Sequence, residues 1–568
     1  AEETWTTRCS PGNVPVTDET LGKLAADAAR RWGDKECVVS LHQGVRLTFN
    51  EILGRADRFA AGLKRLGLER GDRFGIWAPN DVEWIIGFVA ATRAGLVSVS
   101  INPTYKLNEI AYCLKKAGIK AVLSPANFKN QDYPAMLLRA KQTCPTLEHI
   151  IIYSKDHVAF INKTACEWEK RKYGFIIKSS GSSDSRNQNS ITDDSQLGYG
   201  EQDRISCHSG SNIQFTSGTT GNPKATLLSH RSLVNNARQV TGFRFNVLRS
   251  EIRMENKVCL NVPFFHVYGL IKGLLTMFHT GVTIVLEARS FNPTKSLDAI
   301  IGEKCDTVYG TPTMWVNLRR HRIRESFNFN NIKVKVKERK KNPFRLILVF
   351  FLIEIIKVFR VCSLRGKKKK KISNFWWRNI VSWPPINNVL FQKVVDENGK
   401  TVPFGTRGEL WSRGYSNMIE YYNDEEATKK SITKDGWFKT GDQFILRSDG
   451  YGQIVGRLKE MIIRGGENIF PKEIEDVIMM HPLVAEVQVI GAYDEVYGEE
   501  LCACVRLRDG AKLEKEELKE FCASQMASFK IPHYVEFVTE YPKTSSGKVQ
   551  KYVLKREMER KTKEASSC

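Results

Sequence analysis

The stretch Thr216-Ser-Gly-Thr-Thr-Gly-Asn-Pro-Lys224 gathers hydroxyl side chains, two glycines and a lysine into nine residues. Glycine permits positive φ angles, so the backbone N–H groups of such a loop can turn toward one anion together with the hydroxyls and the ammonium group. The short apolar segment Ile213-Gln-Phe215 before the loop is typical of a strand, and residues Ser229 to Asn236 after it can open a helix. Since α/β folds usually bind phosphates at such a position, the stretch predicts a polyphosphate-binding loop.

The loop differs from a Walker A motif, in which the lysine directly follows the second glycine. Here Asn222 and Pro223 stand between Gly221 and Lys224. An ordinary polar surface loop is the alternative interpretation, and the density of phosphate-binding groups disfavours it. The loop resembles the signature of the adenylate-forming superfamily, which comprises acyl-CoA synthetases, luciferases and peptide-synthetase adenylation domains. Within it, the chain is most similar to the mitochondrial medium-chain acyl-CoA synthetases, although Ala225 stands where that family usually has glycine.

The bulk composition is that of a folded, multidomain protein. With 568 residues, of which 42% are apolar, the chain is long enough for at least two domains with cores of their own. Its thirteen cysteines form no Cys-x-x-Cys pair, which favours reduced thiols in an intracellular compartment and indicates no metal cluster. The chain begins without an apolar signal core or an arginine-rich leader, so we expect any targeting peptide to be absent or already removed.

The formal net charge of +23 would ordinarily point to nucleic acid or an anionic membrane as a partner. Between Arg319 and Lys371, however, nineteen Lys or Arg residues face only three Glu residues, a net charge of +16 in one short segment. The rest of the chain therefore carries only about +7. Because the excess is local, we expect no specific nucleic-acid partner.

Strands and helices alternate in the first part of the chain. Thr48 and Glu51 form a capping box that predicts a helix ending near Gly67. Further along, the sequence predicts a strand at Arg73–Trp77, a helix from Asp81 to Gly95, a strand at Leu96–Ile101, a helix from Asn108 to Gly118 and a strand at Ile119–Leu123. Such alternation predicts parallel βαβ units in a doubly wound sheet.

The resemblance implies how this α/β fold is divided. A large N-terminal domain with doubly wound, mostly parallel sheets would span residues 1–456, and a small, mobile α+β C-terminal domain would span residues 460–568. Residues 457–459, Arg457-Leu-Lys459, would form the hinge between them, with Lys459 as the residue whose dihedral angles change when the C-terminal domain swings.

Two segments depart from the alternating pattern. Residues 173–211 are rich in Ser, Asn, Asp, Gly and Gln and are predicted to form an exposed loop or a disordered insertion. Residues 322–390 hold an apolar run, Leu346 to Ile353, that is too short to span a bilayer, and five consecutive lysines, Lys367 to Lys371. A basic membrane contact or an RNA-binding patch would fit this composition. We rank both below foreign sequence, such as a translated intron or a misassembled gene model.

The resemblance also implies two motifs in this interval that the chain lacks. One is a Gly-Gly-x-x-x-Pro turn that stacks on adenine, and the other is a Tyr-Gly-x-Thr-Glu motif that contacts phosphate and magnesium. Neither occurs between residues 322 and 390 or elsewhere in the chain. Their absence favours an alternative to an active enzyme: a catalytically impaired or dead homologue, or an aberrant gene product, with a non-enzymatic binding role.

Two segments resemble the acyl side of the family's site. His266 and Phe265 lie in Asn261-Val-Pro-Phe-Phe-His-Val-Tyr-Gly269, and the resemblance implies that both face the acyl substrate. A histidine in an apolar run is otherwise typical of a packed core, and the motif favours the pocket role. The segment Tyr309-Gly-Thr-Pro-Thr-Met-Trp315 would end a strand near the same site.

Four motifs near the end of the chain complete the resemblance. Asp442 in Trp437-Phe-Lys-Thr-Gly-Asp442 would accept two hydrogen bonds from the ribose diol, and Arg457 would contact ribose or phosphate. Gly465 and Gly466 would allow the close backbone approach needed along a pantetheine tunnel. Lys548 in Lys543-Thr-Ser-Ser-Gly-Lys548 would be the catalytic lysine rather than a solvated surface charge.

The implied chemistry needs positioning and charge neutralisation more than a protein nucleophile. A carboxylate attacks the α-phosphate of ATP to give an acyl-adenylate and pyrophosphate, and the thiol of coenzyme A then displaces AMP. Lys548 would bridge the α-phosphate and the carboxylate, while Mg²⁺ would offset the polyphosphate charge; no residue is assigned as a protein ligand to the metal. The remaining phosphates would be held by Thr216, Ser217, Gly218, Thr219, Thr220, Gly221 and Lys224.

The implied partners are small molecules: a fatty acid, which the resemblance makes medium-chain, together with ATP and coenzyme A. The implied location is the mitochondrion. The length of the acyl chain depends on the shape of a pocket, which the sequence does not determine.

Overall fold

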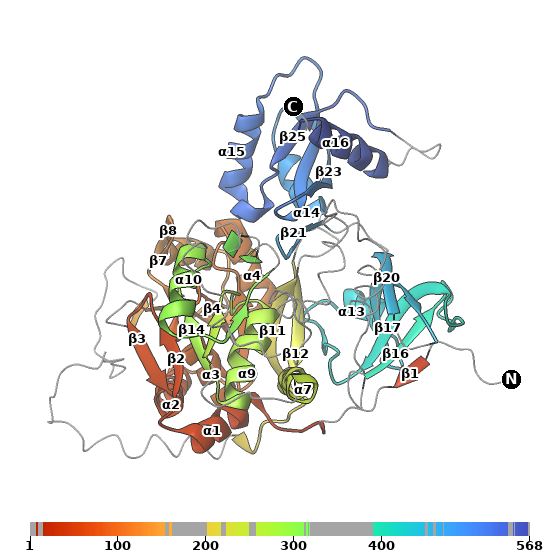
Figure 1. Cartoon of the computed structure of the whole chain (residues 1–568). Coiled ribbons are helices and arrows are strands. Elements are labelled where there is room, and N and C mark those ends of the chain that lie inside the picture. Colours follow the sequence, from red (N-terminus) through yellow and green to blue (C-terminus); the bar gives the residue numbers. More distant parts are fainter. Residues whose placement is uncertain are drawn as a thin grey trace.

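The computed structural model describes residues 7–9, 15–153, 158–161, 202–216, 223–248, 257–311, 314–315, 317–318, 390–448, 452–457, 462–469, 471–542, 549 and 551–565. Two mainly parallel β-sheets lie at the centre of the N-terminal part, a third sheet lies beside them, and the C-terminal part folds over a fourth sheet (Figure 1). The architecture is therefore α/β, with a large N-terminal domain and a small C-terminal domain, as the sequence predicts.

Eight strands form the largest sheet. Its central strands run parallel, whereas β10, β12 and β18 pair antiparallel at its two ends. The order across the sheet is β10 (Val158–Ile161), β9 (His149–Tyr153), β6 (Ile119–Pro125), β4 (Arg73–Trp77), β5 (Val97–Ile101), β11 (Gly210–Thr216), β12 (Lys224–Ser229) and β18 (Glu420–Tyr421).

Five strands form the second sheet, of which only β3 pairs antiparallel. The order is β15 (Thr307–Tyr309), β13 (Lys257–Leu260), β14 (Thr283–Leu286), β2 (Glu36–Ser40) and β3 (Val45–Thr48). A two-stranded ribbon, β7 (Asn127–Phe128) with β8 (Gln131–Asp132), lies apart from both sheets.

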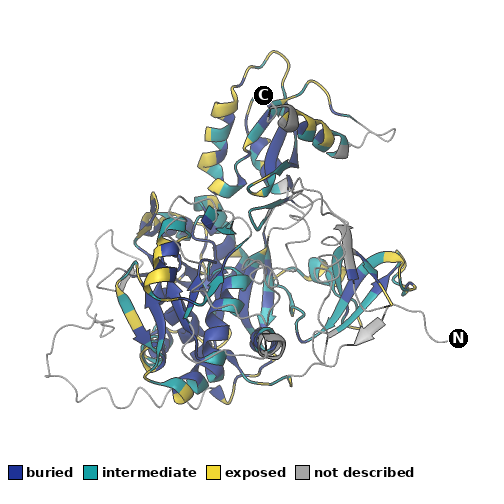
Figure 2. Ribbon diagram, viewed as in Figure 1, coloured by how far each residue is buried: buried dark blue, intermediate teal, exposed yellow. Residues whose placement is uncertain are grey.

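The principal hydrophobic core lies between these two sheets, where Figure 2 shows mostly buried residues. The helical elements that contribute to it are α1 (Leu21–Trp32), α2 (Phe49–Arg65), α3 (Val82–Arg93), α7 (His230–Leu248), α8 (Val267–Gly269), the π-helix η1 (Leu270–Leu275) and α9 (Thr276–Thr280). The outer face of the larger sheet packs against α4 (Leu107–Ala117) and α5 (Tyr133–Lys141), and that of the second sheet against α10 (Pro293–Gly302). Helices on both faces are what parallel crossovers produce.

Local signals in the sequence account well for this part of the fold. The Thr48 hydroxyl accepts a hydrogen bond from Glu51 N, and the Glu51 carboxylate accepts one from Thr48 N, so the predicted capping box is confirmed. The predicted strands at β4, β5 and β6 and the helix at α3 are also confirmed. Helix α4 begins at Leu107, slightly before Asn108, because the Glu109 carboxylate accepts a hydrogen bond from Lys106 N at 2.9 Å.

Asp81 precedes α3 but does not cap it with its side chain. Its buried carboxylate instead accepts hydrogen bonds from Arg289 and Tyr153, and His42 lies within hydrogen-bonding distance at 2.9 Å. Burial alone would raise the pKa of Asp81, but these hydrogen bonds and the Arg289 charge hold it below its ordinary value. The network ties the two parallel sheets together where β4 and β14 end.

Two further sheets are antiparallel, except that one pair of strands in the second of them is parallel. One contains β1 (Thr7–Cys9), β16 (Leu390–Val395), β17 (Arg407–Gly414), β19 (Phe438–Leu446) and β20 (Gly452–Arg457), with α13 (Glu425–Ser431) in the connection before β19. The C-terminal domain has β22 (Glu467–Ile469), β21 (Ile462–Arg464), β24 (Gly498–Leu507) and β23 (Val484–Asp494), and β25 (Tyr534–Phe537) pairs with β24. Its helices are α14 (Pro471–Ile478), α15 (Lys515–Gln525), the 3₁₀ turn η7 (Ser528–Lys530) and α16 (Lys551–Ala565).

Several predictions from the sequence fall partly or wholly outside the described residues. Of the predicted loop at 173–211, residues 202–209 form turns, in which the Gln202 side chain is buried against α3, and Gly210 begins β11. The described part of the basic segment 322–390 is confined to Leu390 in β16.

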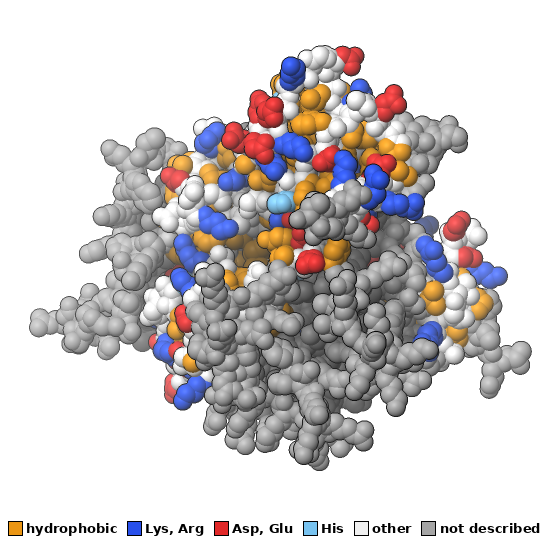
Figure 3. All heavy atoms as spheres, turned by 45° about the horizontal axis from the view of Figure 1, so that its top comes forward, with side chains coloured by type: hydrophobic (Ala, Val, Ile, Leu, Met, Phe, Trp, Pro, Cys, Tyr) orange, Lys and Arg blue, Asp and Glu red, His pale blue; other side chains and the backbone are white. Residues whose placement is uncertain are grey.

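On the face shown in Figure 3, acidic and basic side chains of the C-terminal domain are interspersed.

None of the described helices is both long and apolar enough to cross a membrane.

Candidate active site

The ends of the predicted phosphate-binding loop are held together by an antiparallel pair of strands. Thr216 in β11 and Lys224 in β12 are register partners, while residues 217–222 lie outside the described residues. The Tyr112 hydroxyl donates a hydrogen bond to Pro223 O at 3.0 Å. The Lys224 ammonium lies 4.3 Å from the centre of the Tyr421 ring, a cation–π distance. The fold therefore brings the two ends of the loop together, with a hydroxyl residue, Thr216, at its start and a lysine, Lys224, at its end.

Strand β12 was missed by the sequence prediction, which has the loop leading toward a helix at Ser229. Its buried residues alternate, with Ala225 and Leu227 in the core of the larger sheet, and helix α7 begins only at His230. The predicted helix is confirmed, but the loop does not lie at its N-terminus. If the loop binds phosphate as predicted, the binding would depend on the amides and side chains of the loop itself, without support from a helix dipole.

The His266 segment follows the carboxyl end of β13 and is fixed by a buried asparagine. Asn80 donates from Nδ2 to Val262 O at 3.0 Å, and its Oδ1 accepts from Phe264 N at 2.9 Å. One side chain thus satisfies two backbone groups of the turn that presents Phe265 and His266. Sequence reasoning missed Asn80, because its partners lie 182 and 184 residues away.

His266 caps helix α8 with its ring. Tyr268 N donates a hydrogen bond to His266 Nδ1 at 3.1 Å, so Nδ1 is an acceptor and the neutral ring carries its proton on Nε2. Burial lowers the pKa of His266, and the Glu467 charge opposes that effect only partly. The ring is therefore neutral and fixed in orientation at physiological pH. Its pocket role remains a prediction.

The second segment predicted on the acyl side lies directly beside the first. Strand β15 is parallel to β13 with Tyr309 opposite Leu260, and Asn261 N donates to Tyr309 O at 3.1 Å. The Tyr268 and Tyr309 rings meet edge to face, with centroids 6.3 Å apart. Both segments leave the carboxyl ends of parallel strands, which is where open α/β sheets usually bind their ligands.

Under this region lies a buried carboxyl group, Glu287, which no sequence motif singles out. Glu287 follows β14, and Ser296 Oγ lies 3.0 Å from Asn261 Oδ1 and 3.4 Å from Glu287 Oε1. Burial raises the pKa of Glu287 to about 8. The group is consequently mostly protonated at neutral pH.

This pKa predicts a pH dependence of stability. Between the ordinary value of 4.5 and about 8, the unfolded chain releases the Glu287 proton while the folded chain keeps it, so the free energy of unfolding falls as pH rises. The loss should reach about 3–5 kcal/mol by pH 8. We expect Glu287→Gln to remove this part of the decline in the free energy of unfolding. The measurement compares the urea midpoints of the variant and the unmodified protein at pH 5 and again at pH 8. The exposed Glu148→Gln is the control; a pH dependence unchanged by Glu287→Gln would contradict the assignment.

Asp442 and Arg457, both predicted at the ribose, are brought together by a strand pair. They are register partners in β19 and β20. Gly441 before Asp442 has a φ of 72° and donates its N–H to Glu409 Oε1 at 2.9 Å, and Asp442 N donates to Thr440 Oγ1 at 3.1 Å. The strand that ends at Arg457 leads directly into the predicted hinge, of which Lys459 lies outside the described residues.

Gly465 and Gly466 form the turn of the β21–β22 hairpin. Their φ angles of 58° and 93° lie in the left-handed region, which explains the two glycines by turn geometry. Next to the turn, Arg464 Nε donates to the buried carboxylate of Glu500 at 2.5 Å, and Gly465 N donates to Tyr497 O. The Glu467 charge acts on the pKa of His266, so Glu467 of this hairpin lies near the His266 segment. The remaining predicted groups, Ser217 to Gly221 and Lys548, lie outside the described residues.

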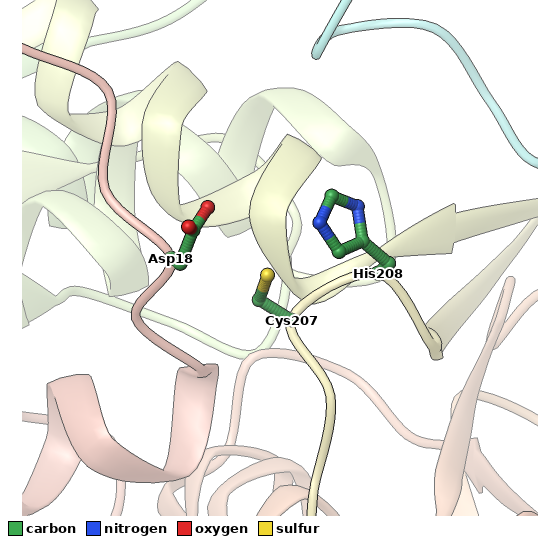
Figure 4. A group of neighbouring side chains, drawn as sticks. All are labelled: Asp18, Cys207 and His208. Carbon is green, nitrogen blue, oxygen red and sulfur yellow. The ribbon is translucent and has the colours of Figure 1, made fainter.

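One group of side chains has the spacing of metal ligands. Figure 4 shows Asp18, Cys207 and His208, whose ligand atoms lie within 4.8 Å of one another. The Asp18 carboxylate already accepts a hydrogen bond from Arg231 Nε at 2.9 Å, and burial together with Asp18 raises the pKa of the Cys207 thiol. A cation would have to displace the guanidinium and deprotonate the thiol, so we assign these residues to an ion pair.

Comparison with known proteins places the chain in one family. The AMP-binding enzyme model matches residues 25–351, and the AMP-binding enzyme C-terminal domain model matches residues 473–548. The mitochondrial medium-chain acyl-CoA ligase ACSF2 of Danio rerio is 35% identical to this chain over 556 residues, and that of Bos taurus is 36% identical over 553 residues. Both alignments cover 96% of this chain. They cover 89% of the Danio rerio protein and 88% of the Bos taurus protein. A putative acyl-CoA synthetase of Bacillus subtilis, YngI, is 30% identical over 574 residues.

Solved structures agree on the fold. The amide bond synthetase McbA of Marinactinospora thermotolerans has a TM-score of 0.70 at 20% identity, covering 94% of this chain and 99% of McbA. The o-succinylbenzoate-CoA synthetase MenE of Bacillus subtilis, as a double mutant with a bound product analogue, has a TM-score of 0.67 at 20% identity, covering 95% and 99%. With two family models in chain order and relatives of at least 30% identity along nearly its whole length, the chain belongs to the AMP-binding enzyme family and is an acyl-CoA synthetase, an acid–thiol ligase.

Proposed function

We propose that this acyl-CoA synthetase activates a medium-chain fatty acid in two steps. In the first, a carboxylate oxygen forms a bond to the α-phosphorus of ATP while the bond to the β-phosphate breaks, which releases pyrophosphate. In the second, the sulfur of coenzyme A attacks the acyl carbon, its proton is lost, and AMP leaves with the bridging oxygen. The observation that carries the proposal is the identity of 35–36% over 96% of the chain to ligases named for medium-chain substrates.

The geometry supports a separate binding role for each of the predicted groups. Thr216 and Lys224 would bind the β- and γ-phosphates, since a hydroxyl and an ammonium group suit phosphate oxygens and the two residues are register partners at the two ends of the loop. Asp442 would accept hydrogen bonds from the ribose, with Arg457 beside it. The neutral His266 and Phe265 would border the acyl chain, and the Gly465–Gly466 turn would border the path of the thiol.

The described residues at the ends of the loop do not offer the ligands that are typical of a magnesium site. Mg²⁺ is held mainly by carboxylates and phosphate oxygens, whereas the two described ends of the loop offer a hydroxyl and an ammonium group, and the sequence lacks the family's Tyr-Gly-x-Thr-Glu motif. The prediction that Mg²⁺ accompanies ATP stays a prediction.

Acyl selectivity is tested with straight-chain acids of short, medium and long length. Purified protein receives ATP, Mg²⁺ and coenzyme A, and acyl-CoA formation is followed by mass spectrometry. We expect the highest kcat/KM for medium-chain acids. A higher kcat/KM for acetate or for long-chain acids would contradict the proposed substrate class while leaving the ligase assignment intact.

A second candidate is favoured by the missing adenine and magnesium motifs between residues 322 and 390. In that case the protein is a weak or inactive ligase with a binding role, because a lost stacking surface costs about 1–3 kcal/mol per base and mispositioning about a hundredfold in rate. The same assay decides between the candidates. Turnover of roughly 1 per second or more rejects the impaired form, and turnover at background with retained ATP binding supports it.

We also propose a mitochondrial location, which the names of the ACSF2 relatives support. Immunodetection of the endogenous protein in fractionated cells tests it. Recovery with a matrix marker is the expected result, and recovery in another fraction would overturn the proposal.

A further inference from the structure

A buried lysine lies where the C-terminal domain meets the N-terminal domain. Lys530 ends the short turn η7, and its side chain is only 3% exposed. Its ammonium group lies 2.8 Å from Glu109 Oε1 on α4 of the N-terminal domain and also pairs with Glu473 on α14 of the C-terminal domain. One cation therefore joins a carboxylate from each domain, an arrangement we call the Lys530 cluster.

Aromatic and apolar side chains enclose this cluster. The Lys530 ammonium lies 4.9 Å from the centre of the Tyr105 ring and 5.5 Å from that of Phe529. Phe529 packs against the cores of both domains, and Ala527 is fully buried in the core of the N-terminal domain. At the rim, Asn108 Nδ2 donates to Gln525 Oε1 at 3.2 Å. The contact is thus a packed interface and not an isolated ion pair.

The electrostatics make the cation necessary to this interface. Burial alone would lower the pKa of Lys530, but Tyr105, Glu109 and Glu473 together raise it above its ordinary value, so the lysine is charged. Burial raises the pKa of Glu473, and the Lys530 charge opposes that shift. Without Lys530, the two carboxylates, which are only 12% and 13% exposed, would lose the cation they share, which is strongly unfavourable.

The cluster also lies close in sequence to the hairpin whose Glu467 lies near the His266 segment. Strand β22 ends at Ile469, helix α14 begins at Pro471, and Glu473 lies in its first turn. Glu109 is equally well anchored on the other side, because its second oxygen accepts the hydrogen bond from Lys106 N at the start of α4. Fixing Glu473 against Glu109 therefore fixes the position of the Gly465–Gly466 turn relative to the His266 segment.

We propose that Lys530 is a positioning residue that holds the C-terminal domain with its Gly465–Gly466 turn toward the His266 segment, and thereby favours the transfer of the acyl group to the thiol. The first part rests on the interface alone. The second part rests on the proposed function, which assigns this turn to the path of the thiol.

The domain arrangement is tested by cross-linking at the rim. Asn108→Cys and Gln525→Cys provide a thiol pair across the interface for a short bismaleimide, and nine of the thirteen native cysteines are buried. We expect Lys530→Met to slow cross-linking at least about tenfold, since it leaves two largely buried carboxylates without their cation. The triple variant Glu109→Gln, Glu473→Gln, Lys530→Met removes all three charges and should restore the rate to within about threefold.

Lys561→Met is the matched control, because Lys561 pairs with Glu536 at 2.7 Å within the C-terminal domain and is 54% exposed. Its cross-linking rate should not change. Restoration by the triple variant shows that the single variant had lost the charge balance of the interface and not its fold. A cross-linking rate unaffected by Lys530→Met would overturn the proposed positioning role.

The catalytic consequence is tested separately in the two half-reactions. Lys530→Met should lower the rate of thiol transfer from a synthetic acyl-adenylate about tenfold, while ATP–pyrophosphate exchange with the acid stays within about twofold. Equal losses in both would reject the preference for thiol transfer. If the unmodified protein forms no acyl-CoA, the proposed function fails, and the cross-linking result still decides the role of Lys530 at the interface.

Discussion

Replacing Lys548 with alanine should nearly abolish acyl-adenylate formation and spare thiol transfer from a pre-formed acyl-adenylate. In the assigned role, its ammonium group meets negative charge that develops between the carboxylate and the α-phosphate. Removing one such group from a transition state costs on the order of 3–4 kcal/mol, or about 10²–10³ in rate. The measurement compares pyrophosphate release from ATP and acid with thioester formation from synthetic acyl-adenylate.

Lys561→Ala serves as the control for this experiment, because it removes an exposed lysine from the helix that follows Lys548. It should leave both half-reactions unchanged. Equal losses of the two half-reactions in Lys548→Ala would refute the assigned role, because a group needed for adenylation alone cannot slow the second step to the same extent.

The second large effect is expected at Gly269, in helix α8 directly after the His266 turn. A Cβ atom at this position would lie 2.1 Å from Pro263 O and 3.1 Å from Val262 O, and both are backbone atoms that cannot rotate away. Gly269→Ala must therefore push the helix from the turn that presents Phe265 and His266. We expect a loss of about 3 kcal/mol in stability and about a hundredfold in kcat/KM, since a shift of about 1 Å can cost that much in rate.

Gly302→Ala is the matched control, because Gly302 also ends a helix but has nothing within 4 Å of the added Cβ. Alanine there should be neutral or stabilise the protein by up to about 1 kcal/mol. Thermal unfolding and steady-state kinetics of the two variants provide the comparison. If Gly269→Ala behaved like Gly302→Ala in both measurements, the tight approach of α8 to the His266 turn would be contradicted.

Much of the N-terminal fold could be predicted from sequence because its signals are local. The capping box of α2 and the ends of α3 and α4 depend on residues within one helical turn. Strand β12 could not be predicted in this way. It pairs with β18 almost two hundred residues later, through Thr226 with Tyr421 and Leu227 with Glu420, and its six residues follow a loop that already suggested a helix start.

In the candidate site, too, the residues with local signals could be predicted from the sequence and those with long-range partners could not. The chemistry of Thr216 to Lys224 is concentrated in nine residues and is visible in the sequence. Asn80 acts on a turn 182 residues away, and Lys530 pairs with Glu109 across 421 residues, so neither role leaves a pattern within one segment. Glu287 gave no signal either, because its raised pKa arises from burial that only the packed second sheet creates.

The central claim is that the acid is activated as an acyl-adenylate, and the fate of the carboxylate oxygen tests it most directly. The fatty acid is supplied with heavy oxygen in its carboxyl group, together with ATP and coenzyme A, and the nucleotide product is analysed by mass spectrometry. If the carboxylate attacks the α-phosphorus and the thiol then cleaves the acyl–oxygen bond, each AMP formed carries one heavy oxygen. Unlabelled AMP, or a label found in phosphate or pyrophosphate, would contradict the account.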